Sequence, residues 1–155
     1  MPEFSTTRHV RHSASDMFDL VADVESYPKF VPLCSGMKLR SRSEQPDGTV
    51  TIVADMTVAY KLIRETFRSR ALLDRTRLRI LVNYLDGPFS RMENRWEFLP
   101  TQDKACDVRF FISYEFRSRM LGLLMGAMFD TAFRRFAVAF EKRADVVYGK
   151  QSQAS

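Results

Sequence analysis

The chain has 155 residues, of which 45% are hydrophobic and 28% charged, and its formal net charge at pH 7 is +5. This length fits one domain with a full hydrophobic core, and the composition excludes wholesale disorder. The two cysteines lack metal-ligand spacing, and no run reaches the roughly eighteen apolar residues of a membrane-spanning helix, so a disulfide scaffold, a zinc site and a membrane span are all excluded.

The first quarter of the chain predicts one strand and two short helices. Residues 4–11 alternate well enough for an edge strand. Ser13 is then a candidate N-cap with Asp16 three positions later, which is a weak capping box at the start of a helix. A second short helix or turn over 25–30 ends before Pro32, because proline cannot continue a helix.

From Leu33 to Phe116 the apolar residues recur with a period of two, which predicts six further strands. The first of them begins at Leu33, and turn residues separate it from those that follow. Tight turns imply an antiparallel meander, and the alternation implies one solvated and one buried face. The remaining predicted strands cover 50–60, 63–73, 75–84, 90–99 and 106–116.

The last predicted element is a helix over Arg119–Tyr148, roughly 45 Å long at 1.5 Å per residue. Its apolar residues recur at offsets of three and four and form one stripe, rich in phenylalanine and in methionine, which adapts its shape to irregular apolar surfaces. Gly122 and Gly126 each cost about 1 kcal/mol relative to alanine. They indicate a close approach by another backbone, a hinge or a widened entrance, and residues 149–155 are expected to be a polar tail.

These elements predict one α+β domain over residues 1–148. Its curved antiparallel seven-stranded sheet wraps around the long C-terminal helix, and two short helices follow the first strand. The apolar stripe then either fills a core or leaves room for an apolar guest.

No arrangement of residues in the sequence predicts catalysis. His9 and His12 lie three positions apart, so in a strand they face opposite sides. No Ser-His-Asp or Cys-His grouping, no cluster of metal ligands and no phosphate-binding glycine loop is present. We therefore expect a protein that is not an enzyme and that has no metal and no cofactor.

The basic residues are spread along the chain without a block of five, so we expect no DNA binding. The charge leaves a ribosome or an anionic membrane as partners. The segment 121–129 is apolar and is flanked by arginines, which indicates a peripheral membrane contact during ligand loading. Those arginines are Arg117, Arg119, Arg134 and Arg135.

Four short motifs resemble those of the coenzyme Q-binding protein family of START-like domains, which is grouped with the polyketide cyclase/dehydrase-like domains. The resemblance covers about residues 4–148 and implies the helix-grip fold. The matching motifs are Tyr27–Cys34 (YPKFVPLC), Leu85–Phe89 (LDGPF), Asn94–Phe98 (NRWEF) and Ala139–Arg143 (AFEKR).

The resemblance implies non-catalytic binding and delivery of a polyprenylated quinone, ubiquinone above all, in support of respiration. The same family includes ribosome-association toxins, so a translation modulator that binds the large subunit is the alternative. The wider superfamily includes aromatic polyketide cyclases, which is the third possibility. Mitochondrial members carry a transit segment that this chain lacks, which indicates a bacterial, cytoplasmic protein at most peripheral to the inner membrane.

The resemblance also implies where the ligand would lie. We expect a dry cavity between the sheet and the terminal helix, with the motif at 27–34 as a lid and the motif at 85–89 facing it. The predicted entrance consists of Tyr27, Pro28, Phe30, Val31, Pro32, Gly87 and Pro88. The predicted cavity lining consists of Tyr60, Tyr84, Phe89, Trp96, Phe98, Phe110, Ile112, Tyr114, Leu121, Leu124, Met125, Met128, Phe129 and Phe133.

Overall fold

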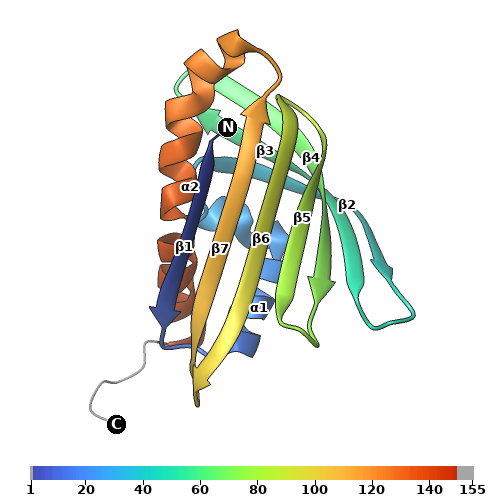
Figure 1. Cartoon of the computed structure of the whole chain (residues 1–155), viewed down its shortest axis with the longest axis vertical. Coiled ribbons are helices and arrows are strands. Elements are labelled where there is room, and N and C mark those ends of the chain that lie inside the picture. Colours follow the sequence, from blue (N-terminus) through green and yellow to red (C-terminus); the bar gives the residue numbers. More distant parts are fainter. Residues whose placement is uncertain (1, 150–155) are drawn as a thin grey trace.

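A computed structural model describes residues 2–149 of the chain. It confirms the predicted α+β fold, in which a curved antiparallel sheet holds a long C-terminal helix (Figure 1). The helices are α1 (Ala14–Ala22), the 3-10 helix η1 (Val24–Lys29) and α2 (Arg119–Tyr148). The strands are β1 (Glu3–Val10), β2 (Cys34–Glu44), β3 (Val50–Tyr60), β4 (Ile63–Asp74), β5 (Arg79–Asp86), β6 (Phe89–Gln102) and β7 (Ala105–Phe116).

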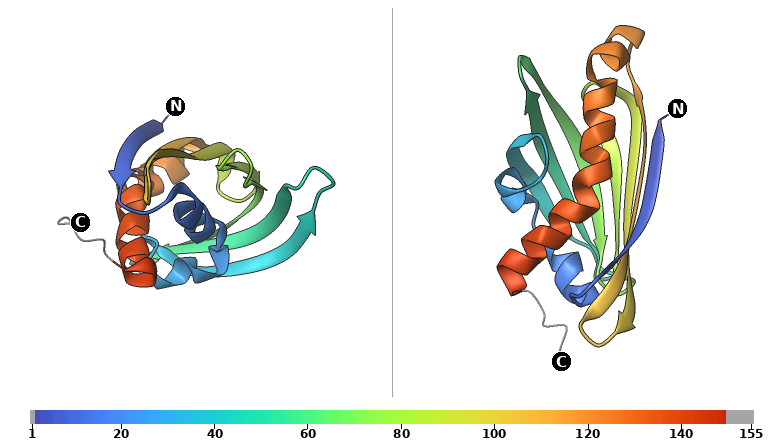
Figure 2. Two further views of the ribbon diagram at one scale, coloured as in Figure 1. Left: turned by 90° about the horizontal axis from the view of Figure 1, so that it is seen from below. Right: turned by 90° about the vertical axis from the view of Figure 1, so that its left-hand side faces the viewer.

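The seven strands lie in the order β1-β7-β6-β5-β4-β3-β2, and every neighbouring pair is antiparallel. Strands β2 to β7 form a meander, and β1 adds to the edge of β7. The sheet curls around α1, and α2 crosses its concave side (Figure 2). In this arrangement α1 and α2 cover the apolar, concave face of the sheet.

Local chemistry explains where the elements begin. The Ser13 hydroxyl accepts a hydrogen bond from the Asp16 backbone N–H at 3.0 Å, as the predicted N-cap requires. The strand predicted over 75–84 begins only at Arg79. Residues 75–78 form a turn instead, in which the Asp74 carboxylate accepts from the Arg77 backbone N–H and Leu78 has a positive φ of 52°.

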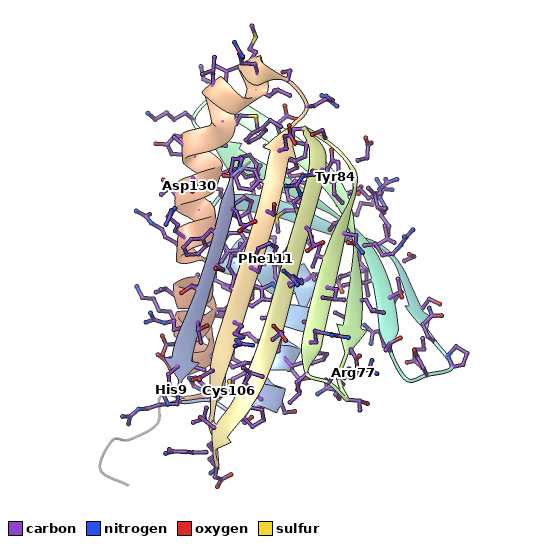
Figure 3. The ribbon with its side chains drawn as sticks, in the orientation of Figure 1. His9, Arg77, Tyr84, Cys106, Phe111 and Asp130 are labelled. Carbon is purple, nitrogen blue, oxygen red and sulfur yellow. The ribbon has the colours of Figure 1, made fainter. Side chains whose placement is uncertain are left out.

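The two faces of the sheet differ as the alternation predicts. Trp96 and Phe98 are buried on the concave face. Phe111 lies on the outer face of β7, where the Arg95 guanidinium covers its ring at 4.3 Å (Figure 3). The outer face is therefore solvated, and the core lies between the sheet, α1 and α2.

The two halves of α2 are covered unequally. In the C-terminal half, the Phe140 ring lies 5.0 Å from Trp96 and 4.9 Å from Phe30. In the N-terminal half, Leu123 is 82% exposed and a Cβ on Gly126 would meet nothing within 4 Å. Of the three alternatives for the two glycines, the close backbone approach is therefore wrong, since a Cβ on Gly122 would meet only the Phe116 side chain, at 3.7 Å. Within residues 2–149, no helix combines the length and apolarity that a membrane crossing needs.

Candidate ligand-binding cavity

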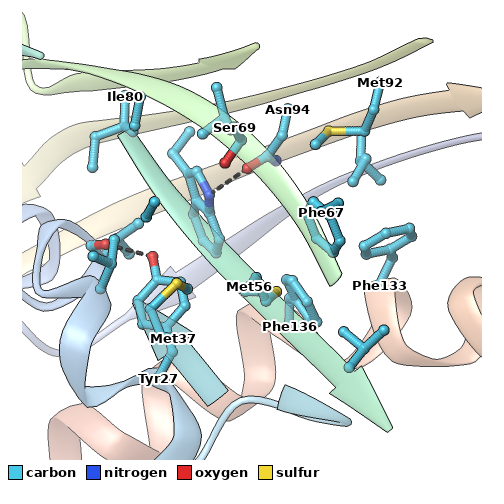
Figure 4. A pocket seen from close by; sticks show the side chains of 18 of the residues that line it. Tyr27, Met37, Met56, Phe67, Ser69, Ile80, Met92, Asn94, Phe133 and Phe136 are labelled. Carbon is cyan, nitrogen blue, oxygen red and sulfur yellow. Dashed lines mark hydrogen bonds between the residues drawn. The ribbon is translucent and has the colours of Figure 1, made fainter. Parts of the chain in front are cut away.

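An apolar cavity of about 80 Å³ lies between the concave face of the sheet and α2. Side chains from α1, η1, strands β2 to β7 and α2 line it (Figure 4). Seven residues of the predicted set lie on its wall: Tyr27, Pro32, Phe89, Trp96, Ile112, Phe129 and Phe133. The hollow that the long helix and bent sheet were expected to enclose is thus present, and binding of a ligand at these residues stays a prediction.

Several lining residues were missed from the sequence. They include the three methionines Met37, Met56 and Met92, together with Phe67 and Phe136. Met56 and Phe67 are directly paired across β3 and β4, so one face of that pair supplies two of them. In the predicted strand 50–60, Met56 shares the alternating apolar face with Ile52, Ala54 and Val58, and this pattern is the signal that could have identified it.

Other predicted lining residues belong to the solid core instead. Phe98, Phe110, Tyr114 and Met125 are almost fully buried, but they do not border the cavity. Phe110, for example, is enclosed by other rings, with Phe4 at 6.2 Å and Trp96 at 4.7 Å. The Tyr84 hydroxyl accepts a hydrogen bond from the Phe89 backbone N–H at 3.1 Å, so it supports a wall residue without reaching the cavity.

Four more predicted residues lie outside the cavity. Leu124 is 62% exposed, because it is one position from the inward-facing Met125 and a helix turns about 100° per residue. Tyr60, at the end of β3, is 44% exposed, and Leu121 is half-buried. Their assignment to the cavity wall was wrong. Tyr60, Leu124 and Met128 instead border a groove of about 490 Å³ between the β3–β4 turn and α2.

This groove adjoins the cavity. Pro32, Leu33 and Ala132 line both of them, so the partition between inside and outside consists of these side chains. We call the groove the mouth groove.

The segment 27–34 forms much of that partition. The Tyr27 hydroxyl donates to the Val21 carbonyl, and the Phe30 ring meets Phe140 edge-on. Leu33 has a positive φ of 66°, and its carbonyl accepts from the Ala59 N–H at 2.9 Å. The segment therefore lies where the predicted lid was expected. The predicted entrance residues Pro28, Phe30 and Val31, however, line neither the cavity nor the mouth groove.

The predicted entrance at Gly87 and Pro88 is wrong. Pro88 is fully buried, and a Cβ on Gly87 would lie 2.5 Å from the Phe67 Cβ. Arg117 closes this corner by donating from Nη1 to the Gly87 carbonyl at 2.8 Å. A turn of glycine and proline looks open in sequence, but here Gly87 lies so close to Phe67 of β4 that a side chain would not fit.

None of the described residues that line the cavity carries a formal charge. Its polar side chains are Tyr27, Ser69, Asn94 and Trp96, and burial raises the pKa of Tyr27 and so keeps its hydroxyl neutral. Burial also raises the pKa of the neighbouring Cys34 thiol to about 11. The cavity can therefore hold neutral, mainly apolar matter, and charged groups would lose their hydration there without compensation.

The candidate catalytic and metal-binding groups lie elsewhere. His9 Nδ1 is 2.9 Å from Asp107 Oδ1, and His12 Nε2 is 2.7 Å from Asp145 Oδ1, so each histidine has its own carboxylate. Across residues 2–149, His, Cys, Asp and Glu side chains form no group of three that could hold a metal ion.

The cavity is small for a lipid in the form described. An engineered cavity that admits benzene measures about 150 Å³, and pockets for larger ligands span roughly 300–1,000 Å³. Even a small aromatic ring therefore requires the wall to move. Met37, Met56 and Met92 are flexible enough for this, and the partition at Pro32 and Leu33 faces the mouth groove.

The chain is similar to known proteins over most of its length. Residues 10–141 match the family model described as "Polyketide cyclase / dehydrase and lipid transport". The chain is 36% identical over 148 residues to the Ribosome association toxin RatA of Escherichia coli strain K12, covering 96% of this chain and 90% of that one. It is also 30% identical over 154 residues to the mitochondrial Coenzyme Q-binding protein COQ10 homolog B of Xenopus laevis, covering 96% of this chain and 60% of that one.

A solved structure agrees with the fold. An 18 kDa protein from Caulobacter crescentus superposes with a TM-score of 0.76 at 34% sequence identity, covering 96% of this chain and 99% of that one. The curved sheet and the terminal helix thus follow a fold that this solved structure shares.

Proposed function

Because the chain belongs to the polyketide cyclase/dehydrase and lipid transport family, we propose that it binds a polyprenylated quinone of the ubiquinone type and delivers it without changing it chemically. The observation that carries the proposal is the apolar cavity, which has no charged residue on its described wall and shares Pro32, Leu33 and Ala132 with the mouth groove. A similarity to a protein named as coenzyme Q-binding supports the choice of ligand class.

The physical driving force is burial of the isoprenoid tail. Removing apolar surface from water stabilises the bound state by roughly 25 cal/mol per Å². Such binding needs no ion pair and no covalent step. The part of the cavity wall formed by residues 2–149 offers neither a charged side chain nor a nucleophile paired with a base. A cyclase would need a proton donor or acceptor beside its substrate, so the lining favours carriage over catalysis.

The mouth groove opens at an end of the molecule that suits an anionic bilayer. The β3–β4 turn and the start of α2 lie at the same end (Figure 2). Leu62 is fully exposed, Met120 is 69% exposed, and Leu123 and Leu124 lie beside Met120 on the helix. Such apolar side chains insert at a bilayer surface, while cations among them attract anionic headgroups. The exposed cations of this end are Lys61, Arg64, Arg117 and Arg119.

The proposal is tested by identifying what the protein carries. Protein purified without detergent is extracted with organic solvent, and the extract is analysed by mass spectrometry. We expect a quinone in amounts that approach the amount of protein. Extracts without any apolar ligand, together with failure to reload the protein from quinone-containing vesicles, would contradict the proposal.

The membrane surface is tested separately with vesicles containing anionic lipid. Replacing Leu123 and Leu124 by aspartate should abolish sedimentation with these vesicles and leave the fold intact, because both side chains are already exposed. The matched control replaces the exposed Val146 and Val147 at the other end of α2. Equal vesicle binding by both variants would contradict this docking surface and leave the cavity untouched.

A second candidate function is binding to the large ribosomal subunit, in the cytoplasm. It is favoured by the 36% identity to a protein named as a ribosome association toxin and by the net charge of +5. Ribosome binding through exposed cations would be salt-sensitive, because each phosphate contact releases counterions. Co-sedimentation with the 50S subunit that weakens between low and moderate salt would support it, whereas no binding at low salt would eliminate it.

A further inference from the structure

We infer that the cavity recognises a neutral headgroup with oxygen acceptors, that Ser69 and Asn94 are the residues that recognise it, and that the headgroup enters first. This inference rests on the proposed function and adds to it the polar pole of the ligand and its direction. The two side chains face the cavity together on the sheet wall, as Figure 4 shows.

Two polar side chains of the cavity wall already use their hydrogen-bond donors within the protein. The Tyr27 hydroxyl donates to the Val21 carbonyl, and the Trp96 indole N–H donates to Asn94 Oδ1 at 3.0 Å. Both donors are therefore already engaged. Of the four polar residues that line the cavity within residues 2–149, only Ser69 and Asn94 still have an O–H or N–H to donate to a ligand.

The Asn94 carboxamide is oriented by two hydrogen bonds. Its Oδ1 accepts from Trp96, and its Nδ2 donates to the Phe111 carbonyl at 2.9 Å across the β6–β7 pair. An amide has two N–H donors and two acceptor lone pairs, so one N–H remains. Because both atoms are held, that N–H is fixed in advance and costs little to use.

The Ser69 side chain is half-buried and borders the cavity, and its hydroxyl makes no hydrogen bond to the other described residues 2–149. A hydroxyl facing an apolar space gains from a partner, since water-like hydrogen bonding is lost there. It can donate to a carbonyl or ether oxygen of a guest.

The register places these two donors apart but on one face. Ser69 of β4 is opposite Tyr84 of β5, and Val82 of β5 is opposite Asn94 of β6. One strand thus separates the two donors, which puts their backbones roughly 10 Å apart at about 4.8 Å per strand. Two separate donors on a concave wall suit a planar head with oxygens on more than one edge. A quinone ring with carbonyl and methoxy oxygens has this form.

The described residues of the cavity wall carry no charge, which limits the chemical class of ligand further. A carboxylate or phosphate would enter without a cation to compensate for its lost hydration. Fatty acids and phospholipids are therefore disfavoured, and neutral oxygen-bearing lipids are favoured.

The orientation of the bound ligand follows from the residues that line the cavity and those that line the mouth groove. Ser69 and Asn94 line the cavity but not the mouth groove, whereas Pro32, Leu33 and Ala132 line both. The donors therefore lie inside the partition. A head bound to them leaves its tail running out past Pro32 and Leu33 into the larger groove.

The test compares ligands that share a tail and differ in the head. Binding of a decyl-substituted dimethoxybenzoquinone, of decylbenzene and of decanoate is followed by NMR shifts of the cavity methionine methyl groups. The variants are Ser69→Ala, Ser69→Thr, which keeps the hydroxyl, and Asn94→Leu. Ser41→Ala removes an exposed hydroxyl from β2 as the control.

We expect Ser69→Ala to weaken quinone binding about three- to tenfold, as loss of one neutral hydrogen bond does, and to leave decylbenzene binding unchanged. Ser69→Thr should retain the native preference better than Ser69→Ala, and decanoate should bind more weakly than the quinone. Asn94→Leu also removes partners from Trp96 and Phe111, so Ser69→Ala decides the question if that variant does not fold.

Equal quinone affinity in the native protein and in Ser69→Ala, or decanoate binding tighter than the quinone, would overturn the inference. In that case decylbenzene binding would show that the proposed apolar carrier survives. Failure of all three ligands to bind would overturn the proposed function and, with it, this inference.

Discussion

His12 Nε2 lies 2.7 Å from Asp145 Oδ1 and joins the turn after β1 to the final turns of α2. The His12 side chain is only 3% exposed, and the ring of Tyr148 lies 6.2 Å from it. Tyr148 also donates from its hydroxyl to the Asp16 carbonyl at 3.1 Å. The end of the helix opposite the mouth groove is thus attached to α1.

His12→Ala should destabilise the protein by about 1.5–3 kcal/mol, because it removes a buried partner of a carboxylate. His9→Ala is the matched control. Its pair with Asp107 is 2.9 Å long but its side chain is 54% exposed, so the expected loss is below about 1 kcal/mol. Urea unfolding of both variants measures the difference, and equal losses would contradict the anchoring role of His12.

Two glycines should respond in opposite directions to alanine. Gly126→Ala should stabilise the protein by about 0.5–1 kcal/mol, because it removes a helix-interior glycine and its Cβ meets nothing. Gly87→Ala should destabilise it by about 2 kcal/mol or more, since its φ is +143° and its Cβ would overlap Phe67. Thermal or urea unfolding checks both, and a Gly87→Ala variant of native stability would show that the corner at β4 is looser than described.

Asp55 should make stability depend on pH in the acid range. Hydrogen bonds from Arg68 and then Arg40 lower the pKa of this carboxyl from 3.8 to about 2. Between these two pH values the unfolded chain binds the proton and the native protein does not, so native stability falls as the pH falls. The contribution is complete above pH 3.8 and lost near pH 2.

The measurement compares urea unfolding of the wild-type protein with that of the Asp55→Asn variant at several pH values. Above pH 3.8 the wild-type protein should have the higher free energy of unfolding, and the difference between the two proteins should shrink toward pH 2. A difference that stays constant over this range would contradict the role of the two arginines.

Cys34 should report the opening of the segment 27–34. Burial raises the pKa of Cys34 to about 11 and that of Cys106 to about 12, so neither thiol is ionised at pH 8 in the closed form. We expect slow labelling by an aromatic disulfide in the Cys106→Ala variant, slower still with a quinone bound. The control is the Cys34→Ala variant, in which labelling of Cys106 measures opening of the core. If Cys34 is labelled no faster than Cys106, the segment 27–34 does not open separately from the core.

The fold could be predicted from the sequence because its strands and helices follow from local patterns in the chain. The alternation of β6 and β7, the turn residues between strands and the three-and-four spacing of α2 each depend on neighbours in the chain, and each is found where expected. The turn at 75–78 was missed because Arg79, Ile80 and their neighbours continue an apparent strand pattern.

The candidate site was harder to predict because a cavity depends on the distances between the sheet and the helices in the folded protein. Phe98 and Trp96 alternate identically on β6, yet only Trp96 reaches the cavity, since α1 packs on Phe98 through Phe18 at 6.0 Å. Leu124 belonged to the apolar stripe by spacing but lies at its edge. Such distinctions need the curvature of the sheet, which no local pattern specifies.

The most direct measurement uses Trp96, the single tryptophan of the chain and a residue of the cavity wall. Quinones quench indole fluorescence on contact, so a decyl-substituted quinone should quench it saturably in the native protein. Ala71→Phe fills the cavity at a cost of about 1–3 kcal/mol and should remain folded without this quenching. Equal quenching in both proteins, or none in the native one, would contradict binding of an apolar ligand between the sheet and α2.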